Sequence, residues 1–177
     1  MMQPSEFTYK EKKIFTLGGI SKKETIYCNE EGYYSTYHSD RYGFNNPDKE
    51  WNNKFINYLL VGDSYVHGAC VNRPNDITSS LRNLGFSALN LGYGGNGPMT
   101  MYATLKEFYQ KDTKFILWFY YYNDHNNLKN EKNDPILNKY IDDETFTQNL
   151  INNQELINKK NFELIFNQLG KDNNFLN

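Results

Sequence analysis

The sequence has no long apolar run, no cluster of basic residues and only two cysteines. Its longest apolar and aromatic stretch, Phe115 to Tyr122, is far too short to cross a bilayer, so we expect no membrane span. The net charge of -2, without a basic run, argues against nucleic-acid binding through phosphate contacts. Cys28 and Cys70 lack metal-ligand spacing and do not define a disulfide framework, so no metal site is expected.

Other signals are also scarce. The amino-terminal residues show no charged-then-apolar signal pattern, so a cytoplasmic location is the default expectation. There are three histidines, His38, His67 and His125, and none follows an acidic residue by three positions. No pattern in the sequence fixes an oligomeric state.

Three apolar segments each run into a turn rich in Gly, Asp or Asn. The turns are Gly62-Asp63-Ser64, the stretch from Asn90 to Gly97, and Asn123-Asp124. Apolar runs that end in this way are typical of buried parallel strands, and ligands of open α/β sheets bind beyond the carboxyl ends of such strands. The pattern therefore predicts that a serine, a glycine-rich loop and an asparagine meet at one edge of a sheet.

The segments between these turns predict strands that alternate with helices. Asp76 suits a helix N-cap, Gly85 suits the residue after the same helix, and Pro98 suits a first helical position. Consecutive strand-helix units imply right-handed parallel crossovers. We expect these elements at 55–61, 64–70, 76–84, 86–91, 98–110 and 114–121, with one or two amphipathic helices within 146–169.

Residues 1–50 differ from the α/β part at 51–177. Their β-branched and aromatic pieces, separated by Gly and Asn turns, predict short antiparallel strands near 14–17, 25–28 and 33–37. We expect a small β-rich lead-in that packs on the main sheet as a flap or an edge. Three parallel strands are few for this architecture. Either the lead-in strands complete the sheet, or the remaining strands lie outside this sequence.

The three strand-end motifs resemble the first three blocks of the SGNH (GDSL-like) hydrolases, over roughly residues 41 to 127. The resemblance implies a three-layer, flavodoxin-like α/β fold with a parallel sheet that is incomplete at the C-terminus. It also implies that Ser64 is the nucleophile and that the amides of Ser64 and Gly95 and the side chain of Asn123 form the oxyanion hole. The family's last block, Asp-x-x-His, supplies the acid and the base, and it is absent from this sequence.

The resemblance further implies an ester hydrolase, either an acetylesterase or a lipase-like acyl hydrolase. Its substrate would be a small ester or an acylated carbohydrate, and no cofactor is implied. Asp63 is expected to brace its loop and Asp124 to order a turn. His67 and Asn96 are expected near the pocket, without an assigned catalytic step.

Several alternatives stay open. Ser64 can instead be a helix N-cap, and the chain can be a non-catalytic carbohydrate-binding or ligand-binding module that lacks the Asp/His pair. Gly92 to Gly97 also satisfies Gly-x-Gly-x-x-Gly, with Asp124 as the ribose-binding acid, which would indicate a dinucleotide-binding α/β domain. Pro98 and the complete strand that precedes the glycines count against that alternative. Tyr120, Tyr121 and Tyr122 are expected to alternate between the core and a pocket.

Overall fold

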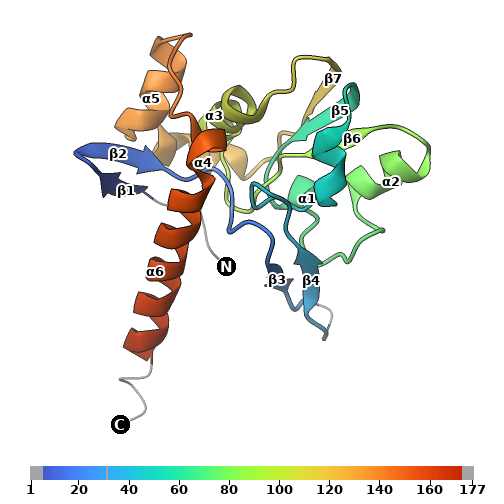
Figure 1. Cartoon of the computed structure of the whole chain (residues 1–177), viewed down its shortest axis with the longest axis horizontal. Helices are drawn as coiled ribbons and strands as arrows, with labels where there is room; N and C mark the ends of the chain where they lie inside the picture. The colour runs from blue at the N-terminus through green and yellow to red at the C-terminus, as the bar shows by residue number, and fades with distance from the viewer. Residues whose placement is uncertain (1–5, 31, 173–177) are drawn as a thin grey trace.

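A parallel three-stranded sheet lies at the centre of the structure, a computed structural model that describes residues 6–30 and 32–172. Its strands are β5 (Ile56–Val61), β6 (Ala88–Asn90) and β7 (Thr113–Trp118), in the order β6-β5-β7. Leu60 pairs with Asn90 on one side and with Leu117 on the other, so the three carboxyl ends lie at one edge (Figure 1). The mixed α/β class and the three predicted parallel strands are confirmed.

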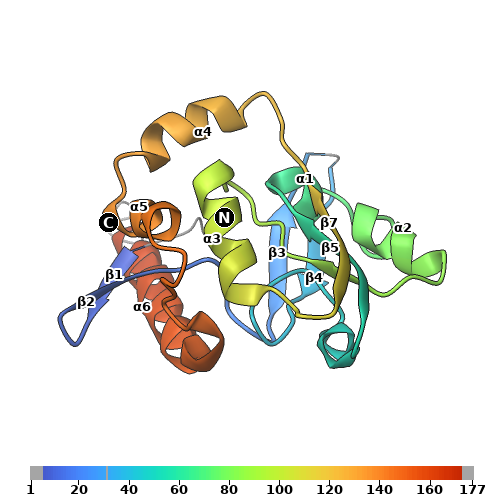
Figure 2. The same cartoon turned by 90° about the horizontal axis from the view of Figure 1, so that it is seen from above.

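Helices lie on both sides of this sheet. Helices α1 (Ser64–His67) and α2 (Ile77–Asn83) lie on one side and α3 (Pro98–Phe108) lies on the other (Figure 2). Neighbouring strand residues point to opposite faces. Accordingly, Leu60 packs with Val66 and Ala88, whereas Leu59 belongs to the larger apolar core. That core also contains Leu89, Met99, Phe108, Leu17, Phe44 and Trp51.

The helix boundaries follow the local signals that predicted them. The Asp76 side chain accepts a hydrogen bond from the Ser79 amide and caps α2, and Pro98 is the first residue of α3. Gly85, with φ +89°, follows α2 in the left-handed conformation that favours glycine. The exception is α1, which ends at His67, three residues before the predicted end, because its C-cap Gly68 also has a positive φ of 84°.

The lead-in strands form two separate hairpins. Strands β1 (Glu6–Tyr9) and β2 (Lys12–Phe15) pair with each other, as do β3 (Glu24–Cys28) and β4 (Ser35–His38). Neither hairpin joins the parallel sheet, so the expectation that these strands complete the sheet is wrong. A β-rich lead-in is nevertheless present, and Leu17 and Phe44 bury their side chains in the core that it shares with the sheet.

A buried carboxylate organises the segment between the hairpins and the sheet, which includes the 3-10 helix η1 (Asp48–Asn52). Asp40 accepts hydrogen bonds from the amides of Tyr42 and Phe44 and from the side chains of Asn46 and Trp51. Burial raises the pKa of Asp40 to about 6, against the lowering effect of these donors. The Asn46 side chain also donates to the Asn90 carbonyl and accepts the Asn90 backbone N–H, which attaches the lead-in to β6.

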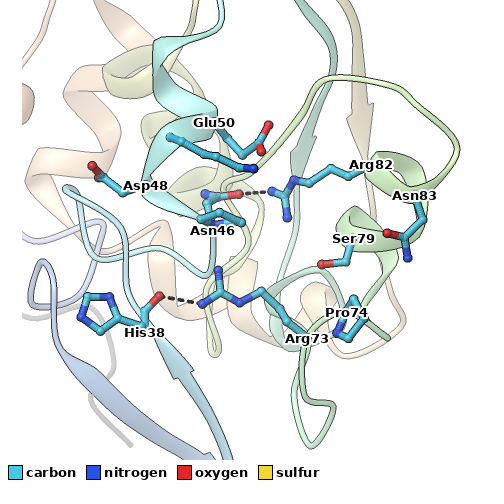
Figure 3. A pocket seen from close by; sticks show the side chains of 11 residues that line it. His38, Asn46, Asp48, Glu50, Arg73, Pro74, Ser79, Arg82 and Asn83 are labelled. Atoms are coloured by element: carbon cyan, nitrogen blue, oxygen red, sulfur yellow. Dashed lines mark hydrogen bonds between the residues drawn. The ribbon is translucent and has the colours of Figure 1, made fainter.

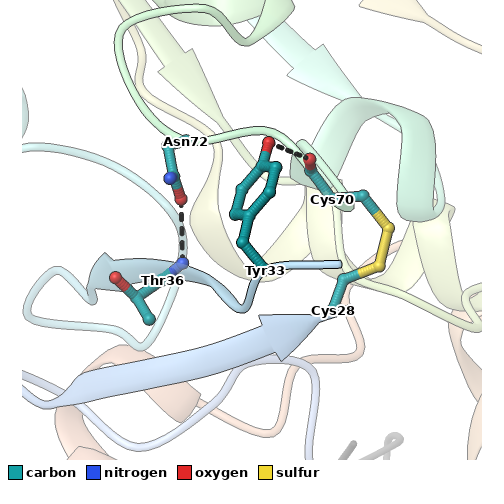
Figure 4. The surroundings of a disulfide bond; sticks show 5 residues. All are labelled: Cys28, Tyr33, Thr36, Cys70 and Asn72. Atoms are coloured by element: carbon teal, nitrogen blue, oxygen red, sulfur yellow. Dashed lines mark hydrogen bonds between the residues drawn. A yellow bond between two sulfur atoms is a disulfide. The ribbon is translucent and has the colours of Figure 1, made fainter. Parts of the chain in front are cut away.

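A disulfide joins Cys28 at the end of β3 to Cys70 in the loop after α1 (Figure 4). The expectation that the two cysteines define no disulfide is therefore wrong. They are 42 residues apart, and only the packing of the β3–β4 hairpin beside α1 brings their Cα atoms to 4.9 Å. The Tyr33 hydroxyl donates to the Cys70 carbonyl, and the Thr36 amide donates to the Asn72 side chain, at the same junction.

The polar carboxyl-terminal part is mostly helical. It contains α4 (Asp124–Glu131), α5 (Pro135–Asp142), the 3-10 helix η2 (Leu150–Asn153) and α6 (Gln154–Asp172). Only the last two were anticipated. Helix α5 packs on α3, where the Tyr140 hydroxyl donates to Glu107. Among the described helices, none is long and apolar enough to cross a membrane.

Strand β7 is uncovered on both faces. Phe115, Ile116 and Trp118 are 47%, 44% and 41% exposed, although they alternate between the two sides of the sheet. No strand within residues 6–30 and 32–172 pairs with the outer edge of β7. The three residues Tyr120–Tyr122 are exposed as well, so the expectation that alternate members enter the core is wrong.

Candidate active site

Ser64 is the first residue of α1, directly after the turn that ends β5. Asp63, not Ser64, is the N-cap, because its carboxylate accepts the Tyr65 amide at 3.0 Å. The alternative role of Ser64 as an N-cap is therefore already filled by its neighbour. Ser64 is half-buried, and no hydrogen bond joins its hydroxyl to a described side chain. The hydroxyl is left available for chemistry.

The end of β7 brings Asn123 to the same place. Its Nδ2 lies 3.4 Å from Oδ2 of Asp63, the residue beside Ser64. The rings of Tyr65 and Tyr121 also contact each other, with centroids 5.1 Å apart. A carboxamide nitrogen carries two donors, so one N–H can face Asp63 while the other stays free for a developing oxyanion.

Asp124 orders the turn at Asn123. Its Oδ2 accepts the Tyr121 amide at 2.6 Å, and its side chain is fully buried. Oδ1 has no partner among the described residues, and burial raises the pKa of this carboxyl group. The contact fits the expected structural role of Asp124.

The glycine-rich loop after β6 is packed against α1. The Asn90 side chain donates to the Val66 carbonyl and accepts the Gly92 amide, so it fixes the start of the loop. A Cβ at Gly92 would lie 2.5 Å from the His67 amide nitrogen, which explains the glycine there. Gly95, further along, is exposed with φ +87°, a conformation that favours glycine.

His67 holds this loop from behind. Its Nδ1 accepts the Gly94 amide at 3.0 Å, so the proton of the neutral ring is on Nε2, which lies 2.8 Å from the Tyr37 hydroxyl. The imidazole lies between the rings of Tyr27 and Tyr93, at centroid distances of 4.0 and 5.0 Å. Burial lowers the pKa of His67 to about 3. His67 is thus a neutral positioning residue rather than a general base.

No described imidazole is hydrogen-bonded to Ser64. The side chains of His38 and His125 are exposed, and neither has a recorded contact with Ser64. Asn96, expected near the pocket, is fully buried, and both polar atoms of its side chain lack a partner among the described residues. The site therefore combines a candidate nucleophile with candidate oxyanion donors, and no imidazole is placed as a base beside Ser64 within the described residues.

Glu131 at the end of α4 occupies the amino terminus of α3. Its carboxylate accepts the amides of Gly97, Met99 and Thr100, together with the Thr100 hydroxyl. In a dinucleotide-binding fold these helix-terminal amides would bind the pyrophosphate. A side chain of this chain already satisfies them, which counts against the dinucleotide alternative. Sequence reasoning missed Glu131 because 34 residues separate it from Gly97.

One grouping of potential metal ligands occurs among the described residues, formed by Cys28, Glu30 and Cys70. Both sulfur atoms are joined in the disulfide, so neither is a free thiolate for a metal ion. The geometry therefore gives no reason to assign a metal there.

Comparisons with protein-family models, with curated proteins and with solved structures find no match for this chain.

Proposed function

We propose that this chain carries the nucleophile and the oxyanion-binding groups of a serine ester hydrolase that acts on a small ester or an acylated carbohydrate. Ser64 is the nucleophile. The amides of Ser64 and Gly95 and Nδ2 of Asn123 are the oxyanion donors. The observation that carries the proposal is that Asp63 caps α1 and contacts Asn123, while the Ser64 hydroxyl has no hydrogen-bond partner among the described residues.

In the proposed reaction, the Ser64 hydroxyl attacks the ester carbonyl while a base removes its proton. Negative charge then develops on the carbonyl oxygen, where donors fixed in advance stabilise it. Loss of one such donor typically lowers the rate by about 10²–10³-fold. His67 cannot serve as the base, because both of its ring nitrogens are engaged and it is buried. The proposal therefore requires a base from outside the described residues.

Chemical rescue tests this proposal directly. The protein is incubated with an activated ester, or with a fluorophosphonate, in increasing concentrations of free imidazole as the external base. We expect acylation or phosphonylation of Ser64, detected by intact mass and peptide mapping, at a rate that rises with imidazole. Ser64→Ala should abolish the adduct. Ser80→Ala, which removes the exposed hydroxyl of a different helix, should leave the adduct unchanged. A Ser64 adduct rate that does not depend on imidazole would contradict the proposal.

A second candidate function is a non-catalytic ligand-binding module with the same site. It is favoured by the lack of an imidazole beside Ser64 among the described residues. This alternative predicts that carbohydrate binding survives Ser64→Ala and that imidazole produces no covalent adduct. The rescue experiment and a binding titration of the same variant therefore separate the two functions.

A further inference from the structure

A pocket lies away from Ser64, bounded by η1, by α2 and by the loop between α1 and α2 (Figure 3). Its volume is about 560 Å³, and Ser64, Gly95 and Asn123 are not among the residues that line it. Two arginines, Arg73 and Arg82, direct their guanidinium groups into this space from different segments. The sequence contains three arginines, and two of them line this pocket.

Arg82 is held by neutral acceptors. Its Nε donates to the Ala88 carbonyl at 3.0 Å, and Nη2 donates to the Asn46 side chain. The third nitrogen, Nη1, is covered by protein atoms and has no partner among the described residues. Burial lowers the pKa of Arg82 against the raising effect of the Glu50 and Asp76 charges, and the charge of Arg73 acts in the same direction as burial. A buried guanidinium N–H group without an acceptor costs free energy, and a bound acceptor would remove that cost.

Arg73 likewise lacks an acidic partner. Its Nη2 donates to the His38 backbone carbonyl at 2.8 Å. Within the part of the chain that the structure describes, neither Arg73 nor Arg82 forms an ion pair. Two like charges thus lie at one pocket without a carboxylate in direct contact with either, although Glu50 and Asp76 act on Arg82 from a greater distance.

The acidic groups that line the pocket are engaged elsewhere. Asp48 binds Arg41 through both of its carboxylate oxygens and also accepts the Arg41 amide. Glu50 accepts a hydrogen bond from Asn53. The third basic residue of the lining, Lys49, has no recorded acidic partner. With Asp48 neutralised by Arg41, the lining keeps an excess of positive charge.

We propose that this pocket binds a tetrahedral oxyanion, the phosphate group of a small phosphate monoester, between Arg73 and Arg82. A guanidinium presents its N–H groups in a fork that matches two phosphate oxygens, and bonds between charged partners are the stronger ones. The unpaired nitrogens of Arg73 and Nη1 of Arg82 come from two segments, and donors from two directions suit a tetrahedral anion better than a planar carboxylate. The volume leaves room for the rest of a small molecule. Because Nη1 of Arg82 is covered, its contact with the anion requires a shift of neighbouring side chains.

Calorimetric titration with inorganic phosphate tests the proposal, with sulfate and acetate as comparison anions and sodium chloride at matched ionic strength. We expect saturable phosphate binding, weaker binding of acetate and none of chloride. Arg73→Gln should weaken phosphate binding by about tenfold or more, because a hydrogen bond to a charged group is lost. Arg73→Lys should restore part of the affinity. Lys111→Gln, the same change of net charge at an exposed site, should bind as the wild type does.

Arg82 also supports the fold through Ala88 and Asn46, so its variant needs a separate check. Arg82→Gln is therefore titrated only after circular dichroism shows that it is folded, and loss of phosphate binding in that protein supports the assignment. The proposal is overturned if phosphate does not bind, or if it binds Arg73→Gln and wild type equally. These outcomes are independent of Ser64, since the titration measures no reaction.

Discussion

The buried imidazole of His67 makes a quantitative prediction about acid sensitivity. In the folded protein burial lowers its pKa to about 3, whereas the ordinary value of 6.5 applies when the chain unfolds. Between these two values the unfolded chain binds a proton that the folded chain does not. Stability that His67 confers is therefore present above pH 6.5 and is lost as the pH falls, by about 1.36 kcal/mol per pH unit. From pH 7 to pH 5 the loss is about 2 kcal/mol.

The wild-type pH profile alone would hide this effect. Asp40 acts with the opposite sign, because its raised pKa of about 6 lets the folded state keep a proton that the unfolded state releases above pH 3.8. Asp40 therefore adds about 1 kcal/mol of stability on acidification from pH 7 to pH 5. The comparison of wild type with His67→Gln removes this contribution, because Asp40 is the same in both proteins.

Urea unfolding of the two proteins at pH 7 and pH 5, followed by circular dichroism, measures the effect. We expect His67→Gln to be destabilised at pH 7 and its deficit to shrink by about 2 kcal/mol at pH 5. His125→Gln, which removes an exposed imidazole, serves as the matched control and should stay close to wild type at both values. An equal deficit at pH 7 and pH 5 would refute the reasoning, because it would mean that folded His67 is protonated as readily as the unfolded side chain.

Three further changes test other contacts. Glu131→Ala leaves the amides at the start of α3 without their acceptor and should cost about 1–2 kcal/mol of unfolding free energy in urea, whereas the exposed Glu144→Ala should cost almost nothing. Reduction of the Cys28–Cys70 disulfide, which closes a 42-residue separation, should lower the denaturation midpoint by the equivalent of about 4 kcal/mol; an unchanged midpoint in dithiothreitol would contradict this. In Asp40→Asn an amide nitrogen replaces one carboxylate oxygen, so two hydrogen-bond donors such as those of Asn46 and Trp51 lose their acceptor. This variant should lose about 2–4 kcal/mol of unfolding free energy in the same urea assay, and an unchanged free energy would contradict the role of Asp40.

Local signals predicted the centre of the fold. The apolar runs at 55–61, 86–91 and 114–121 contain the three parallel strands, which end at Val61, Asn90 and Trp118. Asp76 and Pro98 marked the helix starts. Each signal acts within a few residues, so it can be read without knowing the tertiary structure. The meeting of the three loops followed from the parallel order alone.

The contacts that fasten the site could not be read in this way. Glu131 reaches α3 across 34 residues, and the Cys28–Cys70 pair forms across 42. Helix α4 was missed for a related reason: its sequence is rich in Asn and poor in apolar residues, and its last residue is anchored by α3. His67 was expected near the rim because it lies one turn after Ser64, but a short helix turned its ring toward Tyr37 and the core. Such outcomes depend on packing partners rather than on local propensity.

The uncovered strand β7 has a consequence for how the isolated chain behaves at high concentration. Its outer edge has no paired strand in the part of the chain that the structure describes, and its flanking side chains are large and apolar on both faces. Exposed edges of this kind are templates for pairing with the same strand of another molecule. Two chains that meet along β7 would extend their sheets into one. Colloidal stability of the chain therefore depends on β7, a strand that takes no part in the proposed chemistry of Ser64 although it pairs with β5, the strand that leads to Ser64.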